Sequence, residues 1–182
     1  MIAQSKKELR QLVKQLREKQ DIGEYNIKSA AIMQSVENLA GFRDAATVMI
    51  YWSVRGEVST HDFIRKWAGK KRLVLPSVDG ETMNLKIFEG SDALIAGDLY
   101  GIPEPDGPLF KDHKSIDLID LIVVPGVAFD RNNNRMGRGK AYYDRFLSSV
   151  IAKKIGVCFR FQMFDEIPAD ENDIRMDMVI TD

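Results

Sequence analysis

The chain has 182 residues, of which 45% are hydrophobic and 29% charged, a balance typical of one folded domain rather than a disordered chain. Its net charge of −1 excludes a general attraction to nucleic acid, and no apolar run approaches the ~20 residues that span a bilayer. The single cysteine, Cys158, excludes an internal disulfide, and its apolar surroundings predict a buried thiol. We therefore expect one cytoplasmic domain over residues 1–182, without nucleic-acid or membrane partners.

The N-terminal half alternates helical and extended patterns. Ser5 and Glu8 form a capping box at the start of a helix over Ser5–Gln20, whose apolar residues recur at helical spacing. A second helix around Ile32–Leu39 is expected to end near Gly41, and a third is capped by Ser59 or Thr60 and carries Phe63 and Trp67. Strands are predicted at Thr47–Trp52, at Arg72–Leu75 before Pro76, and at Met83–Phe88.

In the C-terminal half, the predicted elements follow a long irregular region at Ser91–Ser115. A loop of this length in a compact domain is more often functional than not. The expected elements are a strand at Leu118–Val124 before Pro125-Gly126, a helix at Lys140–Val150, and strands at Ile155–Phe159 and Met178–Thr181. Strands that alternate with helices predict an α/β fold with a mostly parallel sheet and helices on both faces. Ligands bind at the carboxyl ends of such strands.

The strongest local signal is the basic, glycine-containing segment Arg135–Asp144, which we expect to join a buried strand to a helix. Gly137 and Gly139 allow backbone N–H groups to approach a ligand, and Arg135, Arg138 and Lys140 supply positive charge. The start of the following helix adds unsatisfied N–H groups. These features favour a phosphate site over an ordinary turn on a basic surface. The segment is not a Walker phosphate loop or a complete dinucleotide-binding fingerprint.

Two further groups of residues are candidates for the same site. Lys6, Arg10 and Arg17 lie on one flank of the first predicted helix, where they form either a second basic site or ordinary surface charge. Trp52 and Glu57 follow a predicted strand, and an aromatic ring with a carboxylate can recognise a flat, nitrogen-rich ring. The alternative is a core tryptophan with a solvated glutamate.

Carboxylates complete the candidate site. Asp144 and Asp173 are possible Mg²⁺ ligands, since this ion is commonly held by one or two carboxylates together with phosphates and water. Taken singly, each fits better as a helix cap or a surface charge. His61 and His113 have no His or Cys partner at metal-ligand spacing, and the sequence contains no recognisable Ser-His-Asp nucleophile motif.

Several motifs in the same order resemble the 5-formyltetrahydrofolate cyclo-ligase family, also called methenyltetrahydrofolate synthetase. The most specific is Arg135-Met136-Gly137-Arg138-Gly139-Lys140-Ala141-Tyr142-Tyr143-Asp144. The others are Lys6–Arg10, Gly56–Thr60, Tyr100–Pro105, Val124–Asp130, Ile167-Pro168, Glu171–Asp173 and Val179–Asp182. One position departs from the family pattern, because Ala141 stands where glycine is usual and alanine disfavours a positive φ.

The resemblance implies a three-layer α/β fold of the sugar-phosphate isomerase and CoA-transferase type. It also implies ATP-driven, Mg²⁺-dependent closure of 5-formyltetrahydrofolate to 5,10-methenyltetrahydrofolate, with release of ADP and phosphate. By family pattern, ATP would contact Lys6, Arg10 and the segment Arg135, Met136, Gly137, Arg138, Gly139, Lys140, Ala141, Tyr142 and Tyr143. Trp52 and Glu57 would contact the folate, and Asp144 and Asp173 would hold Mg²⁺. Arg138 and Lys140 are the catalytic candidates, because phosphoryl transfer needs charge stabilisation more than a protein nucleophile.

Two other functions fit a fold of this type. A sugar-phosphate isomerase or CoA transferase would need no ATP, and fold alone does not fix function. A nucleotide- or RNA-binding module is disfavoured by the near-neutral charge. We expect an enzyme that acts as a monomer on a small-molecule substrate.

Overall fold

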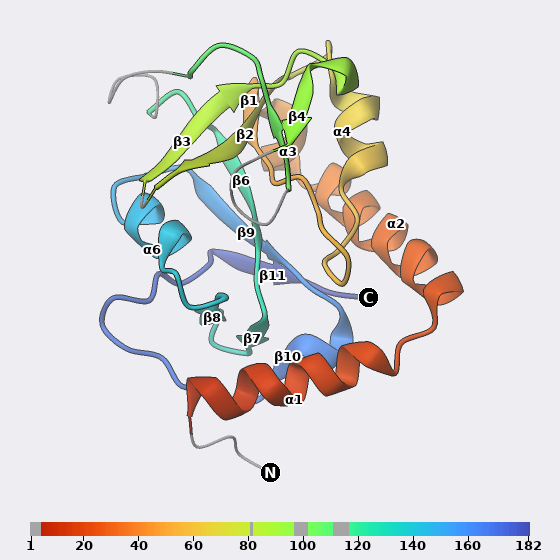
Figure 1. Cartoon of the computed structure of the whole chain (residues 1–182), viewed down its shortest axis with the longest axis vertical. Coiled ribbons are helices and arrows are strands. Elements are labelled where there is room, and N and C mark those ends of the chain that lie inside the picture. The colour runs from red at the N-terminus through yellow and green to blue at the C-terminus, as the bar shows by residue number, and fades with distance from the viewer. Residues whose placement is uncertain (1–4, 81, 97–101, 111–116) are drawn as a thin grey trace.

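A six-stranded sheet forms the centre of the computed structural model, which describes residues 5–80, 82–96, 102–110 and 117–182 (Figure 1). Its strand order is β11-β9-β6-β1-β2-β3, and every neighbouring pair is parallel except β2 and β3. The strands are β1 (Thr47–Met49), β2 (Arg72–Asp79), β3 (Thr82–Ile87), β6 (Leu121–Pro125), β9 (Lys153–Val157) and β11 (Met178–Ile180). The prediction of a mostly parallel sheet is therefore confirmed.

Helices cover both faces of this sheet (Figure 1). On one face lie α2 (Ile22–Asn38), α3 (Ala40–Asp44) and α4 (His61–Trp67), and on the other lies α6 (Tyr142–Leu147). Because successive strand side chains point to opposite faces, Val48 packs with Phe42 of α3 while Met49 packs with Leu147 of α6. The apolar cluster that contains Met49 and Leu147 also contains Cys158, which is fully buried as expected. Two apolar cores on opposite sides of one sheet confirm the three-layer arrangement.

A smaller sheet extends the fold beyond the end of β6. It has the order β10-β7-β8 and consists of β7 (Ala128–Asp130), β8 (Arg135–Met136) and β10 (Met163–Phe164), with η2 (Arg160–Gln162) preceding β10. Helix α1 (Lys6–Glu18) lies across it, and Leu9 and Val13 pack against Ala128 and Met136 (Figure 1). As predicted, Ser5 caps α1 by accepting a hydrogen bond from the backbone N–H of Glu8 at 3.2 Å. This packing brings α1 next to the glycine segment.

The region expected to be irregular, Ser91–Ser115, contains a small hairpin. The 3₁₀ helix η1 (Ser91–Ala93) leads into β4 (Leu94–Ala96), which pairs antiparallel with β5 (Pro103–Pro105). Residues 97–101 and 111–115 of this region lie outside the described residues. Glu104 attaches β5 to β2, because its carboxylate accepts hydrogen bonds from the Ser77 hydroxyl and the Val78 N–H.

The predicted end of a strand at Pro76 was wrong, since β2 continues to Asp79. The carbonyl oxygen of Val74 accepts a hydrogen bond from Ile50 N, so the backbone of Val74 faces the side of β2 on which β1 lies. Residues two apart in a strand face the same side, and the backbone of Pro76 therefore faces that side as well. Strand β1 ends at Met49, which pairs with Val74, and no ladder bond from Pro76 is required. A proline is tolerated where the neighbouring strand has already ended.

Other boundaries differ from the predictions for local reasons. Gly41 lies inside the short helix α3 and does not end a helix, because α2 stops at Asn38. Strand β1 is shorter than Thr47–Trp52, and α6 covers only Tyr142–Leu147. Thr60 precedes α4 but does not cap it with its side chain, because its hydroxyl donates to Tyr51 O at 2.7 Å. The glycine segment does not follow β6 directly, since β7 intervenes and the segment itself begins with β8, the antiparallel partner of β7.

Candidate active site

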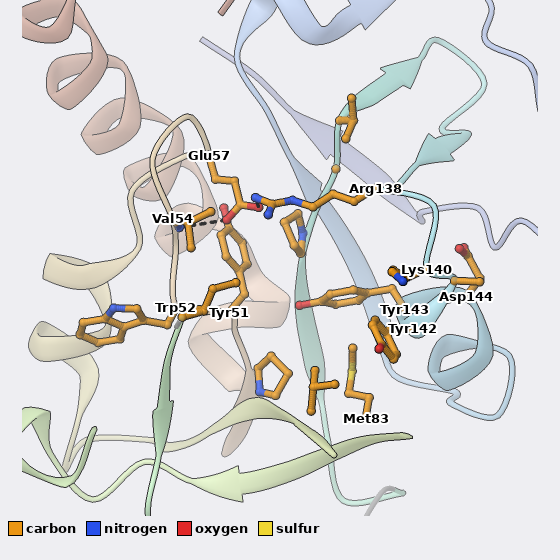
Figure 2. A pocket seen from close by; sticks show the side chains of 18 of the residues that line it. Tyr51, Trp52, Val54, Glu57, Met83, Arg138, Lys140, Tyr142, Tyr143 and Asp144 are labelled. Carbon is orange, nitrogen blue, oxygen red and sulfur yellow. Dashed lines mark hydrogen bonds and ion pairs between the residues drawn. The ribbon is translucent and has the colours of Figure 1, made fainter. Parts of the chain in front are cut away.

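A cavity of about 360 Å³ lies at the carboxyl ends of β1, β2 and β6, the edge of the sheet where the sequence predicts ligand binding (Figure 2). Tyr51 follows β1, Pro76 and Val78 belong to the end of β2, and Gly126 follows β6. The wall includes ten predicted site residues, namely Trp52, Glu57, Arg135, Gly137, Arg138, Lys140, Ala141, Tyr142, Tyr143 and Asp144. Some members of the folate, nucleotide and metal groups of candidates therefore share one cavity.

The remaining five predicted residues, Lys6, Arg10, Met136, Gly139 and Asp173, lie outside this wall. Arg10 reaches the glycine segment from α1, where its Nε donates to Gly137 O at 3.0 Å. A Cβ on Gly139 would lie 3.4 Å from the guanidinium carbon of Arg10, and Gly139 has a φ of +100° that favours glycine. The Met136 side chain is buried beneath α1, so only its backbone could meet a ligand.

Lys6 is held by two carboxylates from the C-terminal loop. Its Nζ lies 2.6 Å from Oδ2 of Asp170 and 2.5 Å from Oδ2 of Asp173. Burial lowers the pKa of Lys6, but the hydrogen bonds and charges of these two aspartates outweigh it and raise the pKa above its usual value. The α1 cations are therefore not a solvated flank, since Lys6 and Arg10 contact the regions that carry Asp173 and the glycine segment.

Glu57 and Arg138 face each other across the cavity (Figure 2). Nη2 of Arg138 donates to Oε1 of Glu57 at 2.7 Å, and Oε2 accepts from Val54 N at 3.1 Å. The Glu57 side chain is only 14% exposed, so the alternative of a solvated glutamate was wrong. Its loop is further held by Tyr25, whose hydroxyl donates to the Glu57 carbonyl oxygen. Trp52 is partly buried and stacks on His61 with ring centroids 4.1 Å apart.

Arg135 and Asp144 form a buried ion pair at the base of the glycine segment. Nη2 of Arg135 lies 2.8 Å from Oδ1 of Asp144, and the two side chains are 3% and 14% exposed. Arg135 also donates to Pro125 O at 3.3 Å. Its charge is therefore largely matched within the protein. Arg138 and the exposed Lys140 remain the cavity cations best able to meet an anionic ligand.

The two predicted metal ligands lie near each other in space. Oδ1 of Asp144 accepts from the N–H of Ile174 at 3.3 Å, and Ile174 directly follows Asp173. Each carboxylate already has a cationic partner, Arg135 for Asp144 and Lys6 for Asp173. Over the described part of the chain, no group of three or more metal-binding side chains gathers. Any Mg²⁺ here would need most of its ligands from phosphate and water.

The start of α6 presents two tyrosines to the cavity. Tyr142 donates its hydroxyl to Gly80 O at 2.9 Å, whereas the buried hydroxyl of Tyr143 has no hydrogen-bond partner among the described residues. Burial, and secondarily the charge of Glu57, raises the pKa of Tyr143. Ala141 adopts a φ of 54°, a left-handed conformation. Alanine at this family glycine position is therefore in the backbone region that alanine disfavours.

Part of the cavity wall was not predicted from the sequence. Met83, Val78, Ile102 and Glu104 line it from β2, β3 and the region of the β4–β5 hairpin. The motif Tyr100–Pro105 pointed to this region without giving any residue a role.

No helix among the described residues is long and apolar enough to cross a membrane.

Comparisons with known proteins agree on one family. The chain matches the profile of the 5-formyltetrahydrofolate cyclo-ligase family over residues 2–182. It is 32% identical to a probable 5-formyltetrahydrofolate cyclo-ligase of Caenorhabditis elegans, over 98% of this chain and 93% of that protein. Identity to the Haemophilus influenzae 5-formyltetrahydrofolate cyclo-ligase is 26%, over 97% of each chain. The solved 5,10-methenyltetrahydrofolate synthetase of Aquifex aeolicus superimposes with a TM-score of 0.85 at 34% identity, covering 97% of this chain and 89% of the other. The Mycoplasma pneumoniae structure, at 24% identity and a TM-score of 0.74, shares the fold.

Proposed function

The chain belongs to the 5-formyltetrahydrofolate cyclo-ligase family, and from this premise we propose how its cavity carries out the reaction with ATP. The substrate is 5-formyltetrahydrofolate and the product is 5,10-methenyltetrahydrofolate. The two competing enzyme types on this fold, sugar-phosphate isomerase and CoA transferase, are not supported by the relatives that the chain matches.

The cavity divides into an apolar part and a cationic part. Met83, Val78 and Ile102 form an apolar wall that suits the ring system of the folate. Trp52 and Glu57 lie at the edge of this part, where the Glu57 carboxylate can accept hydrogen bonds from ring N–H groups. Arg138 currently neutralises Glu57, so ring binding would exchange this partner.

The nucleotide binds along the glycine segment in this proposal. The residues assigned to ATP are Lys6, Arg10 and the segment Arg135–Tyr143. Arg138 and Lys140 contact the transferring phosphoryl group, because guanidinium and ammonium groups stabilise its spreading negative charge. Arg10 supports the segment through Gly137 O, and Arg135 supports it through Asp144.

The reaction needs the formyl oxygen to become a good leaving group. This oxygen attacks the γ-phosphorus, and the bond from phosphorus to the bridging oxygen of ADP breaks. N10 of the folate then attacks the formyl carbon, its proton is lost, and phosphate leaves with the former formyl oxygen. Holding the two substrates in one cavity supplies orientation, and no protein nucleophile is required.

Asp144 and Asp173 fit a magnesium ion that also binds phosphate. Both residues are carboxylates on neighbouring segments. Among the described residues, their hydrogen bonds are accepted by Oδ1 of Asp144 and by Oδ2 of Asp173. The second oxygen of each carboxylate is therefore left for a metal. When bound, Mg²⁺ would neutralise phosphate charge. We also propose that the enzyme works as a monomer.

The observation that carries this proposal is the Arg138–Glu57 contact, because the side chains that we propose for phosphate and for the folate ring meet in one cavity. The test is to mix the protein with 5-formyltetrahydrofolate, ATP and Mg²⁺ and to follow absorbance of the methenyl product. Product should form only when both ATP and a divalent metal are present. Equal turnover without ATP would contradict the ATP-driven mechanism.

A further inference from the structure

The hydroxyl of Tyr143 is a polar atom that the fold buries without satisfying. It has no hydrogen-bond partner among the described residues, although its neighbour Tyr142 donates to Gly80 O. Buried polar groups are nearly always hydrogen-bonded, and an exception at a cavity wall indicates a group whose partner is a ligand. Tyr143 lines the cavity, but its hydroxyl is covered in this structure, so a bound molecule meets it only where cavity side chains move apart, as proposed above for Arg138 and Glu57.

The ring of Tyr143 is held in place by its surroundings. It packs against the apolar cluster on the α6 face of the sheet, and the Arg135 guanidinium carbon lies 5.5 Å from its ring centroid. Figure 2 shows Tyr143 extending from the start of α6 into the cavity, toward Tyr51 on the opposite wall. A fixed ring gives its hydroxyl a fixed position.

That position lies between the two parts of the proposed site. Figure 2 shows Tyr143 between Arg138, assigned above to phosphate, and Met83 of the apolar wall assigned to the folate ring, and all three residues line the cavity. The substrate atom that must lie between these two parts is the formyl oxygen, because it is bonded to the folate and receives the phosphoryl group. A neutral hydroxyl suits this neutral amide-type oxygen, whereas the phosphates have Arg138 and Lys140.

We propose, on the basis of the function proposed above, that the Tyr143 hydroxyl donates a hydrogen bond to the formyl oxygen of 5-formyltetrahydrofolate. A carbonyl-type oxygen has two lone pairs, so one accepts from Tyr143 while the other attacks phosphorus. Tyr143 thereby orients the nucleophile. The same oxygen leaves with phosphate in the second step, and the hydrogen bond remains in place to stabilise its departure.

The test is the Tyr143→Phe variant, which removes one oxygen and keeps the ring. We expect kcat/KM for 5-formyltetrahydrofolate to fall about tenfold or more, as for the loss of one hydrogen bond in the transition state. Equilibrium affinity for a non-hydrolysable ATP analogue should change by less than about twofold, since the ATP contact proposed above for the segment Arg135–Tyr143 does not use the Tyr143 hydroxyl.

Stability separates this role from a structural one. Removing an unsatisfied hydroxyl should leave the denaturation midpoint unchanged or raise it. Tyr51→Phe is the matched comparison, because the Tyr51 hydroxyl donates to Val58 O at 2.9 Å and its loss should lower the midpoint. A lower midpoint for Tyr143→Phe would overturn the inference by assigning the hydroxyl to the fold.

Other outcomes also decide the question. If the wild-type protein forms no methenyl product with Mg-ATP, the proposed function fails before Tyr143 is considered. If the wild type is active and Tyr143→Phe matches it in kcat/KM, the inference alone fails. A variant that loses affinity for the ATP analogue would show that the hydroxyl contacts the nucleotide, which also overturns the inference.

Discussion

Nη2 of Arg138 lies 2.7 Å from Oε1 of Glu57, and this contact joins two loops that are 81 residues apart in the sequence. It neutralises two side chains for which we propose different ligands, phosphate for Arg138 and the folate ring for Glu57. The Arg138 side chain is 47% exposed, so exchanging its partner requires little rearrangement. The contact is worth ~1 kcal/mol or less at such exposure, and substrate binding can readily replace it.

Replacing Arg138 with lysine should lower turnover more than it weakens ATP binding. Arg138→Lys keeps the positive charge but loses the planar fork that holds two phosphate oxygens together. We expect kcat to fall by about tenfold or more while KM for ATP changes less, as for a group that acts mainly in the transition state. Arg131→Lys is the control, since Arg131 pairs with Asp165 on an exposed surface. Wild-type turnover in Arg138→Lys would make Arg138 a bystander.

Arg10 should affect ATP binding through the glycine segment. Arg10→Ala removes the hydrogen bond from Nε to Gly137 O, together with a positive charge beside Gly139. We expect a higher KM for ATP and a loss of about 1 kcal/mol in stability, the usual size of such a hydrogen bond. Lys14→Ala on the exposed side of the same helix is the matched control and should change neither quantity. Unchanged ATP dependence in Arg10→Ala would remove α1 from the site.

Ala141 offers a stabilising substitution. Its φ of 54° costs an L-residue roughly 1–2 kcal/mol relative to ordinary conformations, a cost that glycine avoids. Ala141→Gly should therefore raise the free energy of unfolding by ~0.5–1 kcal/mol and the melting temperature by about 1–4 °C. Ala68→Gly is the control, because Ala68 has a φ of −54° and gains nothing from glycine. A melting temperature that falls equally in both variants would show that Ala141 is not strained.

Local patterns predicted the elements well because each depends on neighbouring residues. The cap of α1 needs only Ser5 and the Glu8 N–H, and the parallel sheet follows from alternating apolar strands and helices. The extent of β2 depends on where β1 ends, which no local pattern around Pro76 contains. The pair β7–β8 was missed because two- and three-residue strands give almost no periodicity.

The candidate site likewise has features that the local sequence predicts and features that depend on how the chain folds. Charge and glycine spacing pointed to Arg138, Lys140 and the segment around them. Carboxylate chemistry pointed to Glu57 and Asp173, to which the family resemblance then gave ligands. The pairing of charges could not be read from the sequence, because Arg135 meets Asp144 and Lys6 meets Asp173 only after the chain has folded. Arg135, expected as a phosphate ligand, is thus also the buried partner of a carboxylate.

The proposed metal ligands differ in what their loss should do to the fold. Asp144→Asn removes the charge opposite Arg135, which is 3% exposed, and breaking a buried pair costs up to about 3–5 kcal/mol. Asp173 pairs with Lys6 at a more exposed position, where the loss should be ~1 kcal/mol or less. Chemical denaturation of both variants measures this difference in the free energy of unfolding. It also shows whether each variant is folded under the conditions of the assay.

With folded variants in hand, magnesium dependence tests the metal site itself. Asp144→Asn and Asp173→Asn should each raise the Mg²⁺ concentration that gives half-maximal rate, because each removes a negatively charged ligand. The double variant should lose less than the sum of the two single losses, because both groups would act on one ion. Asp165→Asn, at an 88% exposed position, is the control and should keep the wild-type dependence. Wild-type Mg²⁺ dependence in both single variants would leave Asp144 and Asp173 as structural partners of Arg135 and Lys6.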